Sequence, residues 1–136
     1  MPPERPDDEP CTITPGEMAE RTGTSVDTLR YYEREGLITG VVRSASGHRR
    51  YGQPDVEWVD VLRCLRLTGM SIAQMKRYAE LVDGGDATHE QRHRLLLEHG
   101  ERVRSEIAEL EAALRVVEHK VTVYGELAGR HEGHTT

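Results

Sequence analysis

The chain has 136 residues, of which 36% are hydrophobic and only 4% aromatic, and its net charge is −6 at pH 7. This length suits one domain, or a small domain with an extension, and so few aromatic residues argue against one large core. No run approaches the roughly 18 apolar residues of a membrane helix, and two cysteines cannot make a disulfide framework. We therefore expect a cytoplasmic protein that has no membrane partner and buries part of its apolar surface between chains.

The charges are unevenly distributed along the chain. Residues 1–11 carry a net charge of −3, residues 12–82 carry +1 and residues 83–136 carry −4. Within the middle part, residues 21–50 contain six arginines but only three acidic residues. Such a local excess of arginine suits binding to phosphate, whereas the acidic parts are repelled from it.

Hydroxyl residues that can cap a helix predict four helix starts. Each is followed three residues later by a side chain that can cap back, and the pairs are Thr14 with Glu17, Thr24 with Asp27, Ser71 with Gln74, and Thr88 with Gln91. Pro54 marks a fifth start, without a good cap. The predicted helices cover residues 15–22, 25–35, 54–67, 71–82 and 88–128.

The segments between and beyond these helices have no helical period. Residues 37–52 contain β-branched residues on either side of a Ser-Ala-Ser-Gly turn, which predicts a short hairpin. Residues 1–11 and 129–136 are polar and aperiodic, so we expect both ends to be disordered.

The last predicted helix carries a narrow apolar stripe with charged flanks. From Val103 onward its members recur at alternating spacings of four and three residues, and Leu96 lies one heptad before Val103. The later members are Ile107, Leu110, Leu114, Val117, Val121 and Tyr124. A helix of about 41 residues is roughly 60 Å long, too long to fold back on a small domain. A second chain is therefore the expected partner in a coiled coil. The alternative is a helix packed on its own domain, since Gly100 interrupts the stripe.

The first two predicted helices, with Gly23 in the turn between them, have the size of a helix-turn-helix. The second helix carries arginines, tyrosines and hydroxyl residues, which donate hydrogen bonds to phosphates and base edges. Leu29 and one tyrosine are expected in the core. The hairpin, with Arg49 and Tyr51 directly after its turn, would form a basic wing beside this helix.

Three motifs in this order resemble the MerR family of transcriptional regulators. They are Ile-Thr-Pro-Gly-Glu-Met-Ala at 13–19, Thr-Leu-Arg-Tyr-Tyr-Glu at 28–33 with Gly-Leu-Ile at 36–38, and Gly-His-Arg-Arg-Tyr at 47–51. The resemblance implies a mainly α fold, with a winged helix-turn-helix DNA-binding head over 12–83 and an antiparallel coiled-coil homodimer through 88–128. It also implies that the dimer distorts promoter DNA with an overlong spacer, so that RNA polymerase engages both promoter elements.

The resemblance also assigns roles to individual residues. It implies recognition-helix contacts from Ser25, Thr28, Arg30, Tyr31 and Arg34, and wing contacts from Arg43, Arg49 and Tyr51. Arg63 or Arg66 on the next helix is expected to touch phosphate.

We expect neither a metal nor a cofactor. Metal-sensing members of the family use several cysteines after the head, and this chain has none after Cys64. The histidine pairs His89–His93 and His131–His134 are too few for a selective site. We likewise expect no appended ligand domain of the kind that the drug-binding members have.

The surroundings of Cys64 resemble the aldehyde- and electrophile-responsive branch of the family, the AdhR/NmlR type, in which a lone thiol precedes Gly-Met-Ser-Ile. Modification of this thiol by an aldehyde or another electrophile would then switch the regulator. Arg63 and Arg66 would favour the reactive thiolate, and Asp60 would oppose it. The alternative is that Cys64 is a small buried apolar residue.

Three other functions are alternatives to this one. An enzyme is not expected, because no nucleophile, base and orienting group recur at a meaningful spacing. A simple winged-helix repressor or architectural DNA binder would lack the long helix. A small ligand could instead bind non-covalently among Met70, Met75, Tyr78 and Leu81.

Overall fold

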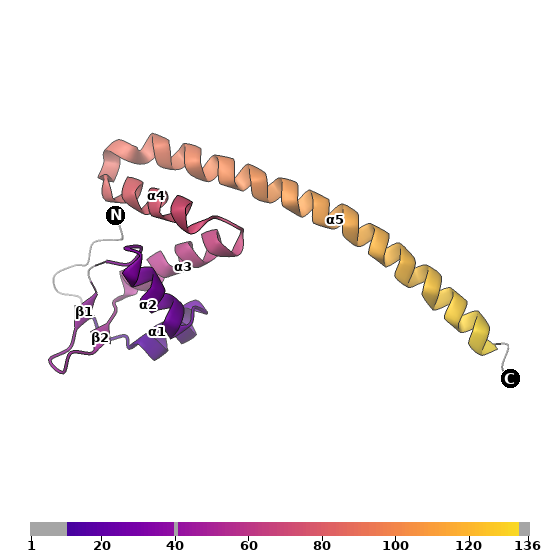
Figure 1. Cartoon of the computed structure of the whole chain (residues 1–136), viewed down its shortest axis with the longest axis horizontal. Helices are drawn as coiled ribbons and strands as arrows, with labels where there is room; N and C mark the ends of the chain where they lie inside the picture. Colours follow the sequence, from indigo (N-terminus) through magenta and orange to yellow (C-terminus); the bar gives the residue numbers. More distant parts are fainter. Residues whose placement is uncertain (1–10, 40, 134–136) are drawn as a thin grey trace. The chain divides into compact units, whose positions relative to one another are not determined.

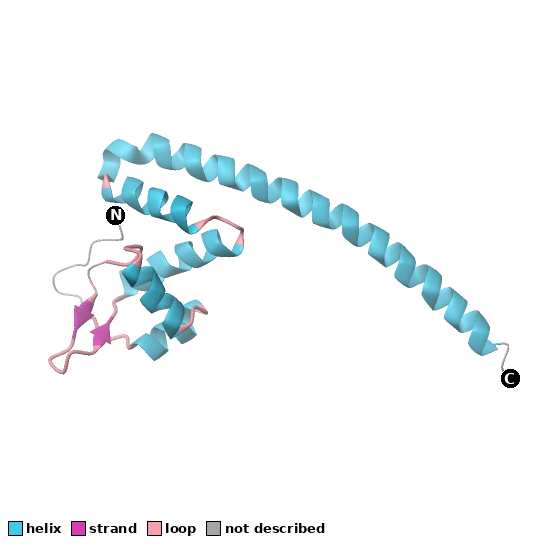
Figure 2. Ribbon diagram, in the orientation of Figure 1, coloured by secondary structure: helices cyan, strands magenta, loops and turns pink. Residues whose placement is uncertain are grey.

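The computed structural model describes residues 11–39 and 41–133, with side chains to Arg130, and divides the chain into two compact units. The first unit ends at Leu97 and the second begins at Glu98. Helices dominate both units, and the described residues form one small two-stranded sheet (Figure 2). The mainly α fold expected from the sequence is thus confirmed. Disorder is predicted for residues 1–11, of which residues 1–10 lie outside the described residues.

Helix α1 (Pro15–Thr22) begins and ends where the sequence predicts (Figure 1). The Thr14 hydroxyl accepts a hydrogen bond from the Glu17 N–H at 3.2 Å, and the Glu17 carboxylate accepts one from the Thr14 N–H at 3.2 Å. Both donors belong to the helix start, where no backbone acceptor is available. The helix ends at Gly23, whose φ of +68° is a left-handed conformation that glycine adopts without steric cost.

Helix α2 (Val26–Arg34) starts one residue later than its predicted cap implies. The cap is Ser25 and not Thr24, because the Ser25 hydroxyl accepts the hydrogen bond from the Thr28 N–H at 3.1 Å. Thr24 is buried instead. Leu29 and Tyr32 also lie in the core, as expected for Leu29 and one tyrosine of this helix.

The predicted hairpin forms, but its strands are short. Strands β1 (Val42–Arg43) and β2 (Arg49–Arg50) pair antiparallel, with Val42 opposite Arg50. The backbone at Tyr51 then pairs with Ile13, ahead of α1, through two N–H···O bonds of 3.0 and 2.8 Å. The base of the wing is therefore attached to the start of the helix-turn-helix.

Helices α3 (Gln53–Leu67) and α4 (Ile72–Asp83) complete the core of the first unit. The carboxylate of Asp55 accepts a 2.8 Å hydrogen bond from the Gly52 N–H, which supplies the cap that the sequence lacked around Pro54. Ser71 caps α4 as predicted, accepting from the Gln74 N–H at 3.1 Å. The core also contains Met18, Leu37, Val59, Leu62, Met70 and Met75.

The chain passes from α4 into its last helix through a short 3-10 helix, η1 (Gly85–Thr88). The sequence predicts that Thr88 caps the last helix, but its hydroxyl is used differently. Its hydroxyl donates back to the carbonyl oxygens of Leu81 and Gly85, and it accepts a 3.0 Å hydrogen bond from Arg92 Nε. Thr88 therefore holds the end of α4 to the beginning of the following helix.

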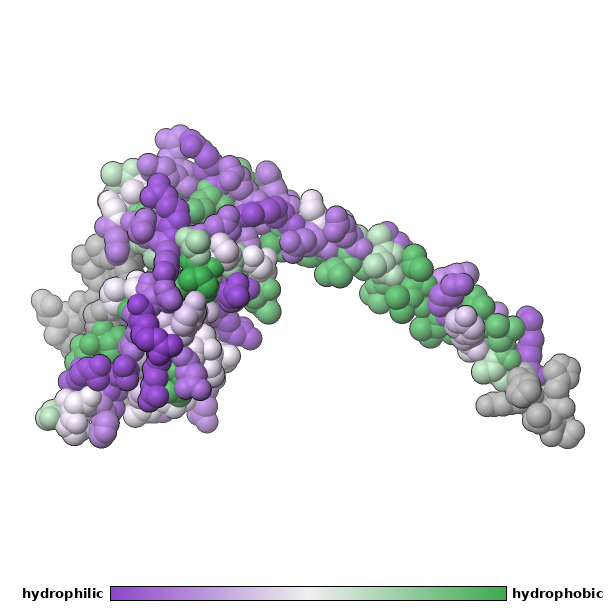
Figure 3. Space-filling view, viewed as in Figure 1, coloured by the Kyte–Doolittle hydropathy of each residue, from purple (hydrophilic) through white to green (hydrophobic). Residues whose placement is uncertain are grey.

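Helix α5 (His89–Gly133) continues past the end at 128 that the sequence predicts. Residues 129–133 are helical, so the expected disorder is wrong for them, and residues 134–136 lie outside the described residues. Figure 3 shows hydrophobic residues recurring along this helix. Within the second unit the exposed apolar residues include Ile107, Leu110, Leu114, Val117, Val121 and Tyr124. None of the described helices combines the length and apolar character of a membrane span.

Candidate nucleic-acid interface

Helix α2 has one buried and one polar face. Leu29 and Tyr32 fix the helix in the core, whereas Arg30 and Arg34 are exposed. The Arg34 guanidinium lies 6.0 Å from the centre of the half-buried Tyr31 ring, within the range of a cation–π contact. The helix thus presents its arginines on the surface while its apolar residues fix its position.

The wing is tied to α2 by an ion pair. Arg49 Nε on β2 donates to Glu33 Oε2 at 2.6 Å, and the Glu33 side chain is only 14% exposed. The exposed Arg43 donates to the carbonyl oxygen of Gly47 at 3.1 Å within the wing itself. Arg34, Arg43 and Arg49 line one shallow cavity of about 320 Å³ together with Glu33, Ile38 and Val41. Arginines that are distant in the sequence therefore meet between helix and wing.

Tyr51 is not a wing contact, contrary to the sequence-based prediction. The residue is 0% exposed, and its hydroxyl donates to Glu33 Oε1 at 3.4 Å. Burial, and then the nearby Glu33 charge, raise the pKa of Tyr51 to about 12. A completely buried phenol cannot touch DNA, so its role is to hold Glu33 and the base of the wing. The alternation of side chains along a strand could have indicated this role, because Arg49 and Tyr51 lie on the same face and both turn toward Glu33.

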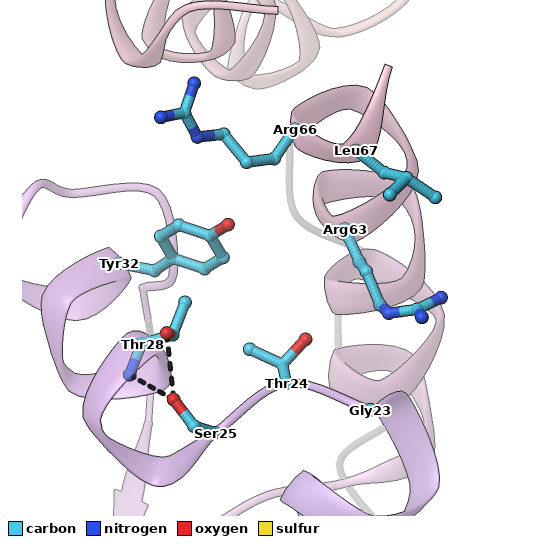
Figure 4. Close-up of a pocket in the computed structure, with 8 residues that line it drawn as sticks. All are labelled: Gly23, Thr24, Ser25, Thr28, Tyr32, Arg63, Arg66 and Leu67. Atoms are coloured by element: carbon cyan, nitrogen blue, oxygen red, sulfur yellow. Dashed lines mark hydrogen bonds between the residues drawn. The ribbon is translucent and has the colours of Figure 1, made fainter. Parts of the chain in front are cut away.

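A second cavity, of about 410 Å³, lies between the helix-turn-helix and α3 (Figure 4). It brings together Ser25, Thr28, Arg63 and Arg66, all predicted from the sequence to contact DNA. Its remaining lining residues are Gly23, Thr24, Tyr32 and Leu67. The sequence predicts Thr24 as a helix cap, and it predicts that the tyrosines of the second helix, Tyr32 among them, donate to DNA or, in one case, pack in the core.

Cys64 lies on α3 between Arg63 and Arg66, and it is exposed. The alternative that Cys64 is a small buried apolar residue is therefore wrong. Cys11, the other cysteine, is half-buried near Gly52.

The residues suggested for a non-covalent ligand pack in the core. Met70, Met75 and Leu81 are buried, and Tyr78 stacks on Trp58 with the ring centres 5.9 Å apart. None of these four side chains lines either of the two cavities described above. Among the described residues no group of three or more potential ligands could hold a metal ion.

Two family models match the chain. The model described as MerR HTH family regulatory protein matches residues 13–81, and the model described as MerR, DNA binding matches residues 56–119. The second match extends from α3 into α5, so the two models together cover both units.

Individual relatives agree with these matches. An uncharacterized HTH-type transcriptional regulator of Haemophilus influenzae is 41% identical over 113 residues, which are 83% of this chain and 84% of that protein. The HTH-type transcriptional regulator AdhR of Bacillus subtilis is 39% identical over 87 residues, covering 64% of this chain and 62% of AdhR. These relatives and families are transcriptional regulators, so the expectation that the chain is not an enzyme is confirmed.

A solved structure is similar over most of its length. The crystal structure of HiNmlR, described as a MerR family regulator lacking the sensor domain and bound to promoter DNA, gives a TM-score of 0.77 at 40% identity. The match covers 85% of this chain and 91% of that one. The winged helix-turn-helix expected for the head is the fold of this relative.

Proposed function

Since the chain belongs to the MerR helix-turn-helix family of regulatory proteins, we propose that it binds double-stranded promoter DNA and regulates transcription. The observation that carries this proposal is the cavity where Arg34 of α2 meets Arg43 and Arg49 of the wing. Helix and wing share one cationic surface in a chain whose net charge is −6. Such a surface attracts the DNA backbone, which the acidic remainder of the chain repels.

Within this surface the exposed side chains of α2 have separate tasks. Arg30 and Arg34 are long enough to reach base edges in the major groove, where a guanidinium can donate two hydrogen bonds to guanine. Ser25 and Thr28, at the start of the helix, and the aromatic Tyr31 contact the backbone or neighbouring bases. Arg43 on the wing adds a phosphate contact beside the helix.

We infer that the regulator acts as a homodimer through α5. The seam residues Ile107, Leu110, Leu114 and Val117 are all exposed in the single chain, and an apolar seam of this length is stable in water only when covered. Leu96, Val103, Val121 and Tyr124 extend the same seam. An antiparallel coiled coil would place two heads on one DNA site.

The dimer is proposed to distort promoters whose spacer is too long, so that RNA polymerase can engage both elements. Bending DNA by 40–90° costs on the order of 1–6 kcal/mol, which is enough to change promoter use. If this is correct, a promoter with a shortened spacer is transcribed without the protein. In vitro transcription from the parent and shortened promoters, each with and without the protein, tests this step.

DNA recognition itself is tested with the full chain and a gel shift on its own promoter region. Arg30→Ala should lower the affinity by a factor of about 5 to 150 and relax specificity at one base pair, because a bidentate contact contributes about 1–3 kcal/mol. Arg77→Ala is the matched control, since Arg77 is an exposed arginine on α4 paired only with Glu80 among the described residues. Unchanged affinity in Arg30→Ala would contradict the assigned recognition helix.

We further propose that an aldehyde switches the regulator through the exposed thiol of Cys64. The thiol adds to the carbonyl carbon: a C–S bond forms, the carbonyl π bond breaks, and the thiol proton passes to the oxygen, so no oxidant is required. The adduct lies between Arg63 and Arg66 on α3, both of which line the cavity beside Ser25. It would therefore change the surroundings of two DNA-facing cations.

The thiol switch is tested by in vitro transcription with and without formaldehyde, using the parent, Cys64→Ser and, as a matched control, Cys11→Ser. We expect the parent and Cys11→Ser to respond to formaldehyde and Cys64→Ser to lose the response. An equal response from all three proteins would exclude the thiol and direct the search to a non-covalent effector.

A further inference from the structure

We propose that α5 pairs with a second copy of this chain in one antiparallel register, in which Tyr124 of each copy fills a gap beside Gly100 of the other. The inference rests on the homodimer proposed above and deepens it, because it assigns which residues meet across the interface. It also gives a physical reason why the surface of α5 is complementary to itself.

Gly100 occupies a position in the apolar seam of α5 where the single chain gives no reason for a glycine. It precedes Val103 by three residues, in step with the spacing of the seam, and it lies inside a continuous helix. Glycine is unfavourable there compared with alanine. Its φ is not in the left-handed region, and a Cβ at this position would point into open space. The missing side chain therefore leaves a gap in the seam that a group from outside the chain can fill.

Tyr124 is the bulkiest residue of the same seam, and it is 65% exposed. When two copies run antiparallel, each step forward along one helix is a step back along the other. If Gly100 faces the partner's Tyr124, the other layers of the seam are therefore fixed. Val103 then faces the partner's Val121, Ile107 faces the partner's Val117, and Leu110 faces the partner's Leu114. The smallest residue of the seam thus faces the largest, and aliphatic side chains fill the remaining layers.

The twofold axis of this register passes close to the middle of α5. The axis lies beside residue 112, and α5 runs from His89 to Gly133, so nearly the whole helix is paired. The same register places Leu97, which is 52% exposed, beside the partner's Gly125. A Cβ on Gly125 would also point into open space. Both glycines therefore face a bulky, exposed side chain of the other copy.

The charged residues that flank the seam are complementary in this register. Antiparallel helices bring together flanking residues from equivalent positions of the heptad. Arg104 then faces the partner's Glu118, and Glu106 faces the partner's Lys120, and the twofold axis repeats both pairs. All four side chains are exposed, and none of them forms an ion pair with another described residue. Opposite charges on both sides of the coil therefore favour the same register as the apolar seam.

Other arrangements of the same two helices lose these contacts. A shift by one heptad in one direction places Glu111 opposite the partner's Glu118, where like charges repel. A shift in the other direction leaves Glu106 opposite an alanine and places a valine at Gly100, where it fills less of the gap than a tyrosine. A parallel pair brings Glu106 opposite the partner's Glu111 and the two Gly100 residues together. The seam and its flanks thus favour one register.

Crosslinking reports the register directly, in the full chain with Cys11 and Cys64 replaced by serine. Single cysteines are introduced on α5 and treated with a short bismaleimide, and circular dichroism shows that each variant folds. Glu111→Cys lies beside the proposed axis, so it should crosslink to the same residue of the other copy. Glu118→Cys should not crosslink to itself, but it should crosslink to Arg104→Cys when the two proteins are mixed. Mass spectrometry identifies the linked residues.

The gap at Gly100 is tested by filling it. Gly100→Leu adds an apolar side chain to the seam and removes a glycine from a helix, so it should tighten any dimer in which Gly100 faces a small residue. In the proposed register it collides with the partner's Tyr124 and should raise the dimer dissociation constant roughly tenfold or more. Adding Tyr124→Ala should recover most of the affinity. Gly129→Leu, at an exposed glycine of α5 outside the seam, is the matched control and should leave the constant unchanged.

The charge pairs are tested by sedimentation equilibrium at low salt. Glu118→Arg should raise the dissociation constant about tenfold, because both symmetric pairs become repulsive, and adding Arg104→Glu should restore it. Glu111 meets its own copy beside the axis, so Glu111→Gln should have the opposite effect and lower the constant about threefold. Glu109→Gln is the control, since Glu109 is exposed and lies away from the seam.

The outcomes separate the register from the function on which it rests. A parent that sediments as a monomer at micromolar concentration would overturn the homodimer and the register with it. A dimeric parent would leave the homodimer standing, and the register alone would be overturned if Glu111→Cys crosslinked only to Glu118→Cys or only to Arg104→Cys. A dimer that Gly100→Leu tightens would overturn it as well. Promoter binding by the parent, measured by gel shift, tests the DNA-binding function independently of both.

Discussion

Arg49 and Glu33 are 16 residues apart in the sequence, yet Arg49 Nε lies 2.6 Å from Glu33 Oε2. The second oxygen of the same carboxylate accepts from the Tyr51 hydroxyl. One carboxylate on α2 therefore holds two residues at the base of the wing. The wing has only two short strands, and this contact attaches it to α2 in addition to the pairing between those strands.

Replacement of Glu33 by glutamine should loosen the wing. The amide can still accept from Tyr51, but it loses the charge that pairs with Arg49, at a cost of about 1–2 kcal/mol in unfolding free energy. Urea denaturation measures this loss, and a gel shift should show several-fold weaker DNA binding. Glu57→Gln is the control, because Glu57 is exposed and has no ion pair among the described residues. Equal stability of the two variants would rule out the tether.

The pH dependence of stability should reveal the buried phenol of Tyr51. Its pKa is raised from 10.0 to about 12, so the folded protein favours the neutral form. This contribution is complete below pH 10, where the phenol is neutral in both states, and it is lost as the pH rises through about 12. Between pH 9 and 12 the parent should lose about 2–3 kcal/mol more stability than Tyr51→Phe. Urea titrations of both proteins measure the difference, and parallel pH curves would show that Tyr51 does not ionise as described.

The coiled-coil seam is tested by a pair of adjacent valines. Val117 belongs to the heptad stripe and is 56% exposed, whereas Val116 is 64% exposed and lies outside it. A charge at Val117 would have to be buried in the dimer, so Val117→Asp should shift the protein to monomers at micromolar concentration. Val116→Asp should remain dimeric. Sedimentation equilibrium distinguishes these results, and a monomeric Val116→Asp with a dimeric Val117→Asp would place the interface on a different face of α5.

The link between α4 and α5 offers a steric test. A Cβ on Gly84 would lie 2.6 Å from Cγ2 of Thr88, and hydrogen bonds to Leu81, Gly85 and Arg92 prevent Thr88 from moving away. Gly84→Ala should therefore lower the unfolding free energy by about 1–3 kcal/mol. Adding Thr88→Ser removes the methyl group, keeps the hydroxyl and should recover most of the loss. Thermal melts of the single and double variants decide the matter, and a double variant no more stable than Gly84→Ala would refute the clash.

Caps and turn residues predicted the order of elements, but neighbouring hydroxyl residues limited the precision. Thr24 and Ser25 both stand three residues before a polar side chain, so spacing alone cannot choose between them. The choice depends on tertiary packing, which buries Thr24 against the cavity and leaves Ser25 to cap α2. Thr88 failed as a predicted cap for a similar reason, since its hydroxyl is used by α4.

The candidate site was predictable where polar side chains had to be exposed. The exposure of Arg30 and Arg34 could be predicted from the helical period alone, because Leu29 and Tyr32 fix the buried face of α2. Tyr51 could not be separated from its basic neighbours in the wing motif, because its burial depends on Glu33, which is distant in the sequence.

Trp58 is the one tryptophan of the chain, and its position makes it an intrinsic optical probe. Its indole N–H donates to the carbonyl oxygen of Leu37 at 2.7 Å, and its ring stacks on Tyr78 of α4. Its fluorescence therefore reports on the first unit alone, while the helical ellipticity at 222 nm includes a large contribution from α5. Two coincident denaturation curves would mean that the head and the long helix unfold as one cooperative system, and separate curves would give each its own stability.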